Sequence, residues 1–392
     1  MLTEKRTDQQ IRTVERLLSD YKQEKEYVPL ARFLAAFYKR NRQMGSKDRR
    51  AATRLVYHYF RIGRAAAELS FPERLALGEF LCTEESAVVR YVLPALYPWM
   101  SAPLEEKVRV LKDQTPFRLE DVFPYGHHLS AEIDRTAFIK SLFTQPELFL
   151  RIRPAHMEDV VTAFAEAGVA YSQVDRFTLA LPNGTALERI DGINGKYEVQ
   201  DYASQQTEHF FRASAGESWW DACAGAGGKS LLLIDNCPGI KLLVSDVRSS
   251  ILRNLDVRFE AAGIQSYRKK IIDLSKGNTG ILADEQFDGI IVDAPCSGSG
   301  TWGRTPEMIS AFDERSISQF QTLQKRIAGT AVKHLKTGKP LIYITCSVFA
   351  AENEGVVAQL QTQHGLKVES MRLIRGYEQK ADSMFVARLI RQ

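Results

Sequence analysis

The sequence predicts an α/β protein with a doubly wound, mostly parallel sheet, preceded by a helical N-terminal domain and a small α+β module. Three observations predict this fold class. Apolar residues recur at helical spacing in the first third of the chain, strand-like patterns begin near Pro146, and short apolar runs alternate with helix-like stretches after Ser218. A chain of 392 residues has room for two or three domains. We therefore expect domains at residues 1–140, 141–210 and 211–392.

The first of these domains is expected to be helical because its apolar residues follow an i, i+3, i+4 pattern. One such face comprises Ile11, Val14, Leu17, Leu18 and Tyr21, and a second comprises Leu30, Phe33, Leu34 and Phe37. Gly45 ends one predicted helix, and Ser46 can cap the next one.

The small module is expected to mix strands with a helix. Residues 148–153 alternate and predict a strand, residues 156–167 predict a short amphipathic helix, and residues 177–181 predict a strand followed by a Pro-Asn-Gly turn. Arg151 and Arg153 lie on the first strand, where they could face RNA, although isolated strand arginines usually face solvent.

The C-terminal part has the rhythm of a doubly wound sheet. The predicted strands are residues 218–222, 241–245, 269–272, 288–292 and 341–345. Short apolar strands that alternate with helices indicate a mostly parallel sheet. Ligands of such sheets bind beyond the carboxyl ends of the strands, so functional residues are expected there.

Composition excludes several classes of protein. Hydrophobic residues make up 44% and charged residues 26% of the chain, which argues against disorder. No apolar run reaches the ~18 residues of a membrane span, and the first ten residues have no apolar stretch typical of a signal peptide. The five cysteines form no C-x-x-C pair and are too few for a disulfide scaffold, so we expect a reduced, cytoplasmic protein.

The small net charge of +4 conceals one strongly basic segment. Residues 39–64 contain nine basic residues and one acidic residue, interleaved with aromatic residues. Such a segment can bind a phosphate backbone, but it can equally be the solvated face of an ordinary helical bundle. The aromatic residues lie at spacings typical of a core, and both interpretations stay open.

A glycine-rich loop follows the first strand of the predicted sheet, reading Asp221-Ala-Cys-Ala-Gly-Ala-Gly-Gly-Lys229-Ser230. It is not a P-loop, because Cys223 occupies the position of the first required glycine. A dinucleotide fingerprint from Gly225 would need glycine or alanine at Ser230. The loop therefore predicts a nucleotide-like ligand that neither motif describes.

Acidic residues end the next three strands. Asp246 can accept hydrogen bonds from ribose hydroxyls, Asp273 can bind an adenine amino group, and Asp293 follows the fourth strand. A single aspartate at a strand end is usually a turn or helix cap, but three in one sheet fit that explanation poorly. An adenosine-containing cofactor is indicated, and S-adenosylmethionine fits where both phosphate motifs fail.

Two cysteines, Cys296 and Cys346, follow two strands that are expected to be neighbours. A lone cysteine is usually a small buried hydrophobe, but this pair lies at the ligand edge. A zinc site would need more ligands, and no histidine lies close in sequence. A thiolate that attacks carbon 6 of cytosine makes carbon 5 nucleophilic, and a carboxyl group such as Asp293 can serve ring nitrogen 3.

These motifs resemble the RsmB/Sun-type RNA (cytosine-5) methyltransferase family. The glycine-rich loop is similar to its cofactor loop, the run Asp293-Ala-Pro-Cys296-Ser-Gly-Ser-Gly-Thr301 to its Pro-Cys motif, and Tyr343-Ile-Thr-Cys346-Ser with Glu352-Asn-Glu354 to its Thr-Cys motif. Residues 197–205 are similar to its entry motif. The resemblance is strong over 145–392 and weaker over 1–140, which looks like a helical RNA-binding region similar to the antiterminator NusB.

The resemblance implies a Rossmann-like S-adenosylmethionine-dependent methyltransferase and a role for each matched residue. Cys346 would be the nucleophile, Cys296 would help to release the product, and Asp293 and Lys229 would act on the target base. The expected cofactor-binding residues are Cys223, Ala224, Gly225, Ala226, Gly227, Gly228, Lys229, Asp246, Asp273 and Asp293. DNA cytosine methyltransferases use the Pro-Cys cysteine instead, so spacing alone does not choose between Cys296 and Cys346.

Two departures from the family pattern stand out. Gly225-Ala226 replaces the usual Ala-Pro of the cofactor loop, and this change should loosen the loop. Gly303-Arg304 supplies one arginine where many relatives carry two.

The sequence therefore predicts an enzyme that methylates carbon 5 of a cytosine in structured RNA. The resemblance favours 16S rRNA as the partner, with transfer RNA as the alternative, and a monomer is the default. An RNA-binding ribosome assembly factor without turnover and a methyltransferase for small molecules or proteins are the competing hypotheses. Binding of S-adenosylmethionine would distinguish an enzyme from the assembly factor.

Overall fold

The structure is a computed structural model that describes residues 2–24, 26–277 and 280–392. The chain forms two compact units. The helical unit comprises Met1–His127, Asp134–Gln145 and Trp302–Asp313, and the sheet unit comprises His128–Ile133, Pro146–Thr301 and Glu314–Gln392. The chain thus passes between the units several times.

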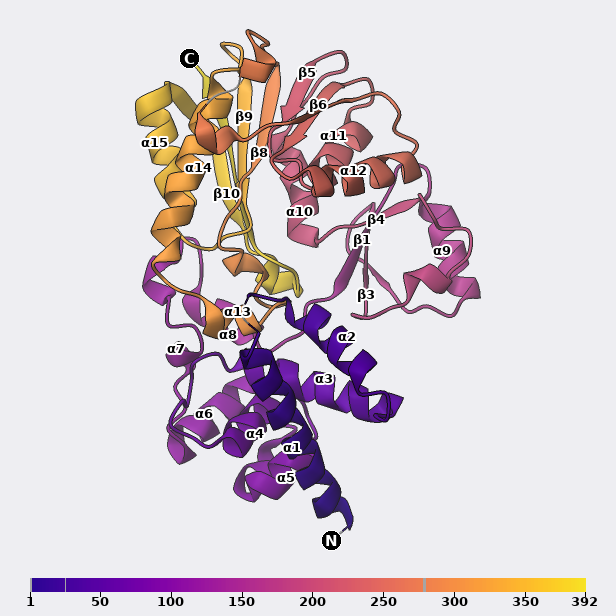
Figure 1. The fold of residues 1–392 in the computed structure, drawn as a ribbon, viewed down its shortest axis with the longest axis vertical. Coiled ribbons are helices and arrows are strands. Elements are labelled where there is room, and N and C mark those ends of the chain that lie inside the picture. The colour runs from indigo at the N-terminus through magenta and orange to yellow at the C-terminus, as the bar shows by residue number, and fades with distance from the viewer. Residues whose placement is uncertain (1, 25, 278–279) are drawn as a thin grey trace. The chain divides into compact units, whose positions relative to one another are not determined.

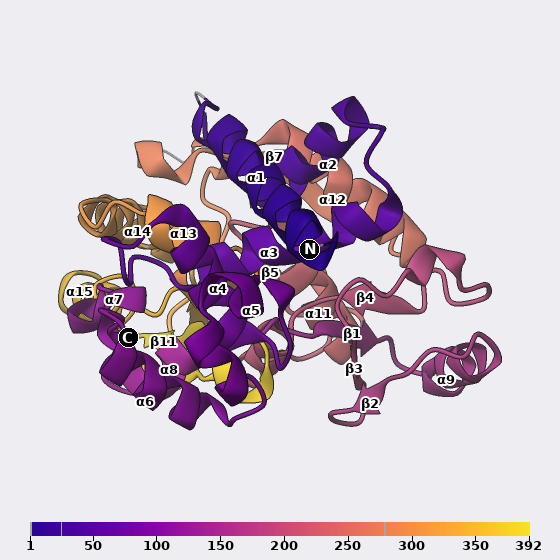
Figure 2. The ribbon, with the colours of Figure 1, turned by 90° about the horizontal axis from the view of Figure 1, so that it is seen from below.

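The helical unit is built from the helices that the apolar periodicity predicts (Figures 1 and 2). Its elements are α1 (Leu2–Lys22), α2 (Leu30–Arg40), α3 (Ser46–Arg61), α4 (Phe71–Cys82), α5 (Ala87–Val92), η1 (Pro94–Trp99), α6 (Leu104–Gln114), α7 (Leu119–Val122), α8 (Arg135–Ser141) and α13 (Glu307–Ala311). A capping box begins α4, where the Glu73 carboxylate accepts the backbone N–H of Ser70 at 2.9 Å. Val14, Leu17, Phe33 and Phe37 are buried in the core, as predicted.

Residues 302–313 belong to the helical unit, although the sequence-based boundaries assign them to the sheet domain. Trp302 is 1% exposed and packs against the rings of Phe123, Tyr125 and Phe312. These contacts join segments far apart in sequence, and no local pattern reveals them.

The sheet unit contains a small antiparallel sheet with the strand order β2-β3-β1-β4 in the described residues. Its elements are β1 (Leu148–Ile152), α9 (Met157–Glu166), β2 (Ser172–Gln173), β3 (Thr178–Leu181), η3 (Leu187–Arg189) and β4 (Tyr197–Val199). Leu150, Val160, Phe164 and Leu179 form its core. We call this part, residues 146–206, the small module.

A larger sheet of seven described strands has the order β10-β11-β9-β8-β5-β6-β7. Its strands are β5 (Ser218–Asp221), β6 (Lys241–Asp246), β7 (Arg268–Ile271), β8 (Gly289–Asp293), β9 (Pro340–Thr345), β10 (Leu366–Ile374) and β11 (Met384–Arg391). β5 to β9 pair in parallel, which confirms the predicted doubly wound sheet. The antiparallel β10 and β11 were absent from the sequence prediction.

Helices cover both faces of the large sheet. They are α10 (Tyr202–Gln206), α11 (Gly228–Asn236), α12 (Ser249–Ala261), α14 (Ser316–Val332) and α15 (Glu354–His364). The crossover from β5 to β6 and the crossover from β8 to β9 run in opposite directions along the sheet, so right-handed connections place their helices on opposite faces. Figure 1 shows α14 and α15 apart from α11 and α12 in this arrangement. The order reverses between β5 and β8, the place where doubly wound sheets bind ligands.

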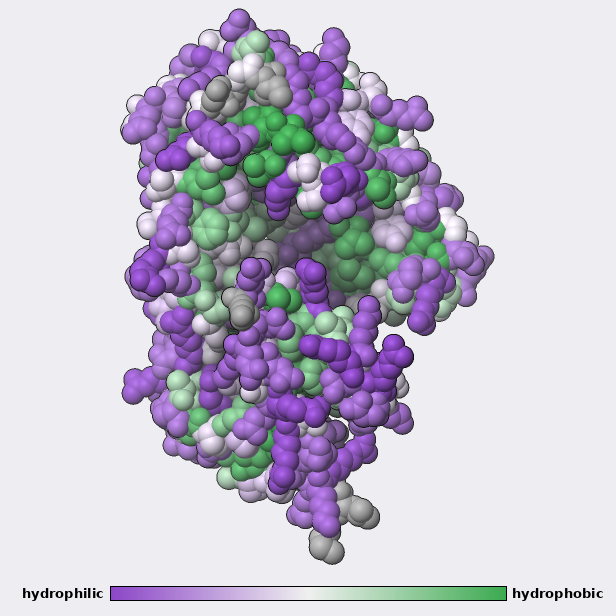
Figure 3. Space-filling model, in the orientation of Figure 1, coloured by the Kyte–Doolittle hydropathy of each residue, from purple (hydrophilic) through white to green (hydrophobic). Residues whose placement is uncertain are grey.

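In the part of the chain that the structure describes, no helix has the length and apolar character needed to cross a membrane. Hydrophilic residues predominate on the face seen in Figure 3, and hydrophobic residues form smaller patches among them.

Candidate active site

The glycine-rich loop connects β5 to α11 at the carboxyl edge of the large sheet. Gly225 and Gly227 have φ angles of +53° and +85°, in the left-handed region that favours glycine. A Cβ atom at Gly227 would lie 2.7 Å from Phe259 Cε1, so this position excludes larger residues. A Cβ atom at Gly225 would meet no described atom within 4 Å. The loop is therefore packed at one end and open to a ligand at Gly225.

Asp246 ends β6 and holds this loop. Its Oδ2 atom accepts the backbone N–H of Gly225 at 3.1 Å. Arg248 donates to Asp246 Oδ1 from its backbone N–H at 2.9 Å and from Nε at 3.0 Å, and to Oδ2 from its guanidinium at 3.1 Å. Burial works to raise the pKa of Asp246, but the hydrogen bonds and charge of Arg248 outweigh it and hold the pKa below its usual value. An ionised carboxylate thus lies next to the open part of the loop.

Asp273 and Asp221 occupy two other strand ends. Asp273 follows β7 and caps the short helix η5 (Leu274–Lys276) by accepting the backbone N–H of Ser275. A second hydrogen bond, from Ser275 Oγ, is the main cause of its lowered pKa. Asp221 ends β5 with 0% exposure, and burial raises its pKa to about 7 although Ser230 Oγ donates to it at 2.6 Å. The capping explanation therefore accounts for the described contacts of Asp273.

Cys296 and Cys346 lie together at the carboxyl ends of β8 and β9, which pair in parallel. Their Sγ atoms are 3.2 Å apart, and both thiols are free. The hydrogen bond to Cys346, followed by burial, raises the pKa of Cys296 well above its usual value. Of the pair, Cys296 is therefore held as a protonated thiol that can donate to Cys346.

Gly300 brings the two cysteine loops into contact. Its backbone N–H donates to the carbonyl of Cys346 at 2.9 Å, and its carbonyl accepts from Ser383 at 2.9 Å. A Cβ atom there would lie 2.1 Å from the Ser383 carbonyl oxygen, so only glycine fits.

Glu352 is a buried carboxylate that joins the two cysteine loops to α14. It is 0% exposed and accepts hydrogen bonds from the Ser297 backbone N–H at 2.9 Å, from Gln324 Nε2 at 2.9 Å and from Ser347 Oγ at 2.8 Å. Three donors from separate segments satisfy one carboxylate, so removal of Glu352 would leave several buried donors unpaired. We call Glu352 with these three donors the cysteine-loop clamp.

Lys229 is a nearly buried lysine that connects the glycine-rich loop with the chemical end of the sheet. Its Nζ atom donates to Ser204 Oγ at 2.6 Å and lies 3.3 Å from the Asp293 carboxylate and 4.0 Å from Met384 Sδ. Its side chain is 7% exposed, whereas that of Asp293 is 31% exposed. The pair therefore offers an accessible carboxyl group whose position is fixed by a buried lysine.

The small module contacts the glycine-rich loop directly. Arg258 of α12 forms an ion pair with Glu198 of β4 at 2.5 Å and also donates to the carbonyl of Ala226 at 3.2 Å. Gln200 donates to the carbonyl of Gly228 at 3.4 Å. These contacts brace the loop at the place where Gly225-Ala226 replaces the usual Ala-Pro.

Arg151 and Arg153 face neither RNA nor solvent, so both sequence interpretations are wrong for them. Arg151 is 5% exposed, and both arginines pair with the buried Asp235, at 2.5 and 2.8 Å. Arg151 also donates to Gln200 Oε1 at 2.8 Å. They hold the small module against α11, a contact between distant segments that strand periodicity cannot reveal.

The basic segment 39–64 of the helical unit divides into core and surface. Its aromatic side chains are buried or half-buried, and most of its basic side chains are exposed: Lys39, Arg40, Arg42, Lys47, Arg50, Arg54 and Arg64. Arg61 is 1% exposed and donates instead to the backbone carbonyls of Leu142 and Thr144. The segment therefore presents a basic face without exposed stacking platforms.

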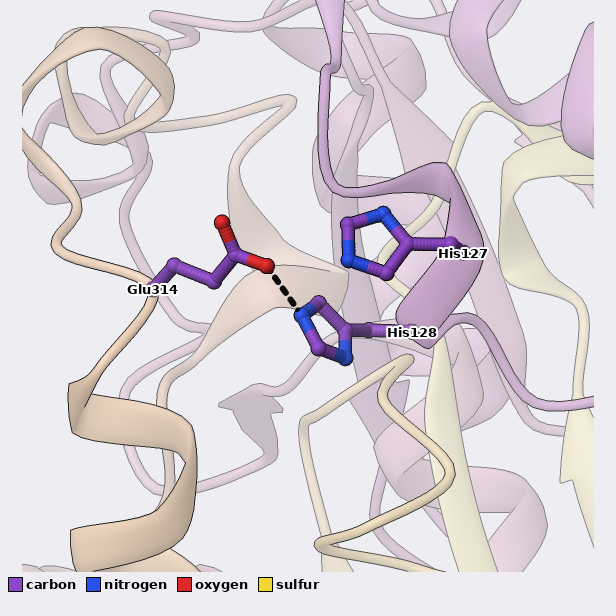
Figure 4. Close-up of side chains that lie close together, drawn as sticks. All are labelled: His127, His128 and Glu314. Atoms are coloured by element: carbon purple, nitrogen blue, oxygen red, sulfur yellow. Dashed lines mark hydrogen bonds and ion pairs between the residues drawn. The ribbon is translucent and has the colours of Figure 1, made fainter.

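Sequence reasoning gave no role to Ser204, Gln324 or Glu352, although two of them lie in quoted motifs. Ser204 belongs to the entry motif and Glu352 to the Thr-Cys motif. Their place in these motifs is the signal that could have identified them as functional residues. Gln324 lies in a helix outside every motif, and only its contact with Glu352 identifies it. Elsewhere in the sheet unit, His128 and Glu314 form a hydrogen bond, drawn in Figure 4.

Residues 209–390 match the model of a family described as 16S rRNA methyltransferase RsmB/F. Over these residues the chain is similar to the RsmB/F family. Ribosomal RNA small subunit methyltransferase B of Erwinia tasmaniensis is 30% identical over 228 residues, which cover 56% of this chain and 52% of that relative. The chain spans about half the length of the curated relatives that it matches.

Solved structures resemble larger parts of the chain. The crystal structure of PH0851 covers 97% of this chain and 98% of its own, with a TM-score of 0.71 and 20% identity. NSun6 from Pyrococcus horikoshii, solved with SFG, covers 68% of this chain and 97% of its own, with a TM-score of 0.60 and 14% identity. At this identity the likeness concerns the fold alone.

Proposed function

We propose that the protein transfers a methyl group from S-adenosylmethionine to carbon 5 of a cytosine in RNA, with 16S rRNA as the substrate. The observation that carries this proposal is the pair of thiols, Cys296 and Cys346, 3.2 Å apart beside the Lys229–Asp293 pair. Methylation of an amine or a carboxylate needs no thiol, whereas carbon 5 of cytosine needs a nucleophile at carbon 6.

The residues of the glycine-rich loop fit S-adenosylmethionine, which supplies a methyl group activated on a sulfonium sulfur. The open backbone at Gly225 allows close approach, and the ionised Asp246 is suited to ribose hydroxyls, which would replace its contacts with the 64% exposed Arg248. The backbone from Cys223 to Gly228 and the side chain of Lys229 would surround the rest of the cofactor. Asp273 would bind the adenine amino group with the carboxylate that now caps η5.

Cys346 is the nucleophile in this proposal. Its thiolate attacks carbon 6 of cytosine, the electrons of the carbon 5–carbon 6 double bond become available at carbon 5, and carbon 5 takes the methyl group. Support for this assignment comes from the raised pKa of Cys296, because a thiol that keeps its proton is the poorer nucleophile. Cys296 would help to release the product: the carbon 5 proton passes to water, the double bond returns as the carbon 6–sulfur bond breaks, and the S–H of Cys296 stabilises the departing Cys346 thiolate.

Lys229 and Asp293 would position the base. The Asp293 carboxyl group is the more exposed partner and would contact the ring, donating to nitrogen 3 in its protonated form and accepting from the neighbouring amino group. Lys229, held by Ser204, keeps that carboxylate in place. A base bound in this way must leave its stack, so we expect a flipped or single-stranded target.

RNA as the substrate class is supported by the family of residues 209–390 and by the exposed basic face of segment 39–64. The relatives that match are named ribosomal RNA small subunit methyltransferase B, which supports 16S rRNA. Transfer RNA is the alternative outcome of the test below.

The test is methyl transfer from labelled S-adenosylmethionine to a 16S rRNA transcript and to transfer RNA, with bisulfite mapping of the product. Cys346→Ala should abolish transfer, and Cys296→Ala should accumulate a covalent protein–RNA adduct on denaturing gels. The matched control is Cys237→Ala, which replaces another free cysteine of the sheet unit, directly after α11. This variant should behave as wild type.

Three outcomes would change the proposal. A covalent adduct with Cys346→Ala instead would exchange the roles of the two thiols. Methylation of transfer RNA alone would change the substrate. Absence of both cofactor binding and methyl transfer in the wild type would overturn the enzyme in favour of an RNA-binding assembly factor.

A further inference from the structure

A shallow basic groove lies between α14 and α15, two helices that run side by side in both ribbon views (Figures 1 and 2). Its volume is about 510 Å³, and its walls include Lys325, Arg326, Lys333 and His364. None of its described lining residues carries a carboxylate. The groove therefore concentrates positive charge on α14 and α15, and none of its described lining residues belongs to the cysteine loops.

The helix geometry gathers these cations on one face. Lys325, Gly329 and Lys333 are four residues apart, so they follow one another along α14, and the two lysines are separated by about 12 Å of helix. A Cβ atom at Gly329 would lie 2.6 Å from His364 Nε2, so glycine is what lets the imidazole lie against α14. Burial and the nearby Lys333 lower the pKa of His364, which leaves the charge of the groove to Lys325, Arg326 and Lys333.

The lysines of the groove differ from other exposed lysines of the sheet unit in their charge balance. Lys269 pairs with Asp256, and Lys380 pairs with Glu147 at 3.4 Å. Neither Lys325 nor Lys333 forms an ion pair with any residue that the structure describes. Their charge is therefore available to an anion from outside the chain.

The groove continues from the catalytic loops. Gln321, one helical turn before Lys325, donates to the carbonyl of Ala351 at 2.8 Å. Gln324, the residue directly before Lys325, donates to the carbonyl of Pro295 at 3.0 Å. The same helix thus touches both cysteine loops with its first half and lines the groove with its second half. A strand that leaves the candidate active site along α14 would meet the lysines next.

We propose that the groove between α14 and α15 binds the sugar–phosphate backbone of the RNA whose cytosine is modified, several nucleotides away from the target base. This inference rests on the proposed function for the identity of the RNA. About 12 Å spans roughly three phosphates at 3.4 Å per phosphate along a strand. An acidic protein partner fits less well, because stable protein interfaces use aromatic anchors and none of the lining residues that the structure describes is a phenylalanine, tyrosine or tryptophan.

The test compares two double variants of the full chain. Lys325→Gln with Lys333→Gln removes two groove charges, and Lys269→Gln with Lys380→Gln removes two exposed lysine charges that are already paired. Binding of a labelled single-stranded oligouridine is measured across a salt series, since this probe contains no cytosine and reports backbone contact alone. Methyl transfer to the 16S rRNA transcript is measured in parallel.

The groove variant should weaken oligouridine binding and make the plot of log affinity against log salt shallower by about 1.4, which corresponds to two phosphate contacts on a single strand. Its KM for the transcript should rise while its kcat at saturating RNA stays that of wild type. The control variant should change neither. Equal salt dependence in both variants and wild type would overturn the proposal. If wild type methylates no RNA, the proposed function fails, but the oligouridine series still decides whether the groove binds RNA.

Discussion

The two halves of the candidate active site each bury a carboxyl group, but they satisfy it differently. In the cysteine half, the fully buried Glu352 accepts three hydrogen bonds from described residues on separate segments. In the cofactor half, Asp221 is equally buried, and burial outweighs its hydrogen bond from Ser230 and raises its pKa to about 7. The cysteine half is thus stabilised by its own interior, whereas the carboxyl group of the cofactor half opposes folding at neutral pH.

The difference extends to what holds each half in place. The clamp on the cysteine loops lies within the large sheet and its helices, while the glycine-rich loop depends on Glu198 and Gln200 of the small module through Arg258 and Gly228. Changes in the first half should therefore affect folding and chemistry together. Loss of the small-module contacts in the second half should affect cofactor affinity with less effect on stability.

The largest effect is expected from Glu352→Ala. It leaves the Ser297 N–H, the Gln324 amide and the Ser347 hydroxyl without their acceptor, at a cost of about 4 kcal/mol in unfolding free energy, and it should abolish methyl transfer. Urea unfolding and methyl transfer are the measurements. Glu354→Ala, which removes one hydrogen bond to Ser130, is the matched control and should cost about 1 kcal/mol. Equal losses of unfolding free energy in the two variants would show that Glu352 stabilises the protein no more than Glu354 does.

The next effect depends on pH and concerns Asp221→Asn. Between pH 3.8 and about 7 the unfolded carboxyl loses its proton while the folded one keeps it, so the contribution of this group to stability falls as pH rises through that window. The asparagine variant should therefore have a higher unfolding free energy than wild type. This gain should be about 3 kcal/mol larger at about pH 8 than at about pH 5. Urea unfolding at both pH values, without cofactor, measures this gain. A pH-independent gain would show that Asp221 ionises normally in the folded protein.

The smallest effect is expected from Arg258→Ala. The variant loses the ion pair with Glu198 and the hydrogen bond to the Ala226 carbonyl, so the loop should hold S-adenosylmethionine more weakly, with a KM about tenfold higher and an unchanged kcat. Arg253→Ala, at an exposed position of the same helix, is the control and should leave KM unchanged. A fall in kcat alone would mean that Arg258 acts on the chemistry rather than on the loop.

Local patterns were sufficient to predict the parallel sheet. Each of the five predicted strands coincides with β5 to β9 within one residue at either end, because short apolar runs between helices are a property of neighbouring residues. Because these strands were predicted with nearly correct ends, Asp246, Asp293, Cys296 and Cys346 could also be placed at the carboxyl edge of the sheet. The exposed run of β10 and the nearly continuous buried run of β11 lack the alternation with helices that marked the other strands.

The features that sequence reasoning missed are contacts between distant segments. Arg151 is buried because it forms an ion pair with Asp235, and Lys229 is held in position because it donates a hydrogen bond to Ser204. The ionisation of Asp221 depends on complete burial, which a strand-end aspartate does not reveal. In each case the residue type was visible, but its partner came from another element.

The placement of residues 302–313 in the helical unit decides how the molecule can be taken apart. A fragment that starts at residue 146 would retain Trp302 and Phe312 but lose Tyr125, against which both rings pack, and Phe123, which packs against Trp302. Such a truncation would uncover a large aromatic surface directly after Thr301, five residues beyond Cys296. Neither unit is therefore one continuous stretch of chain that can be cloned or exchanged by itself, because residues 302–313 follow the Pro-Cys loop directly in sequence but belong to the helical unit.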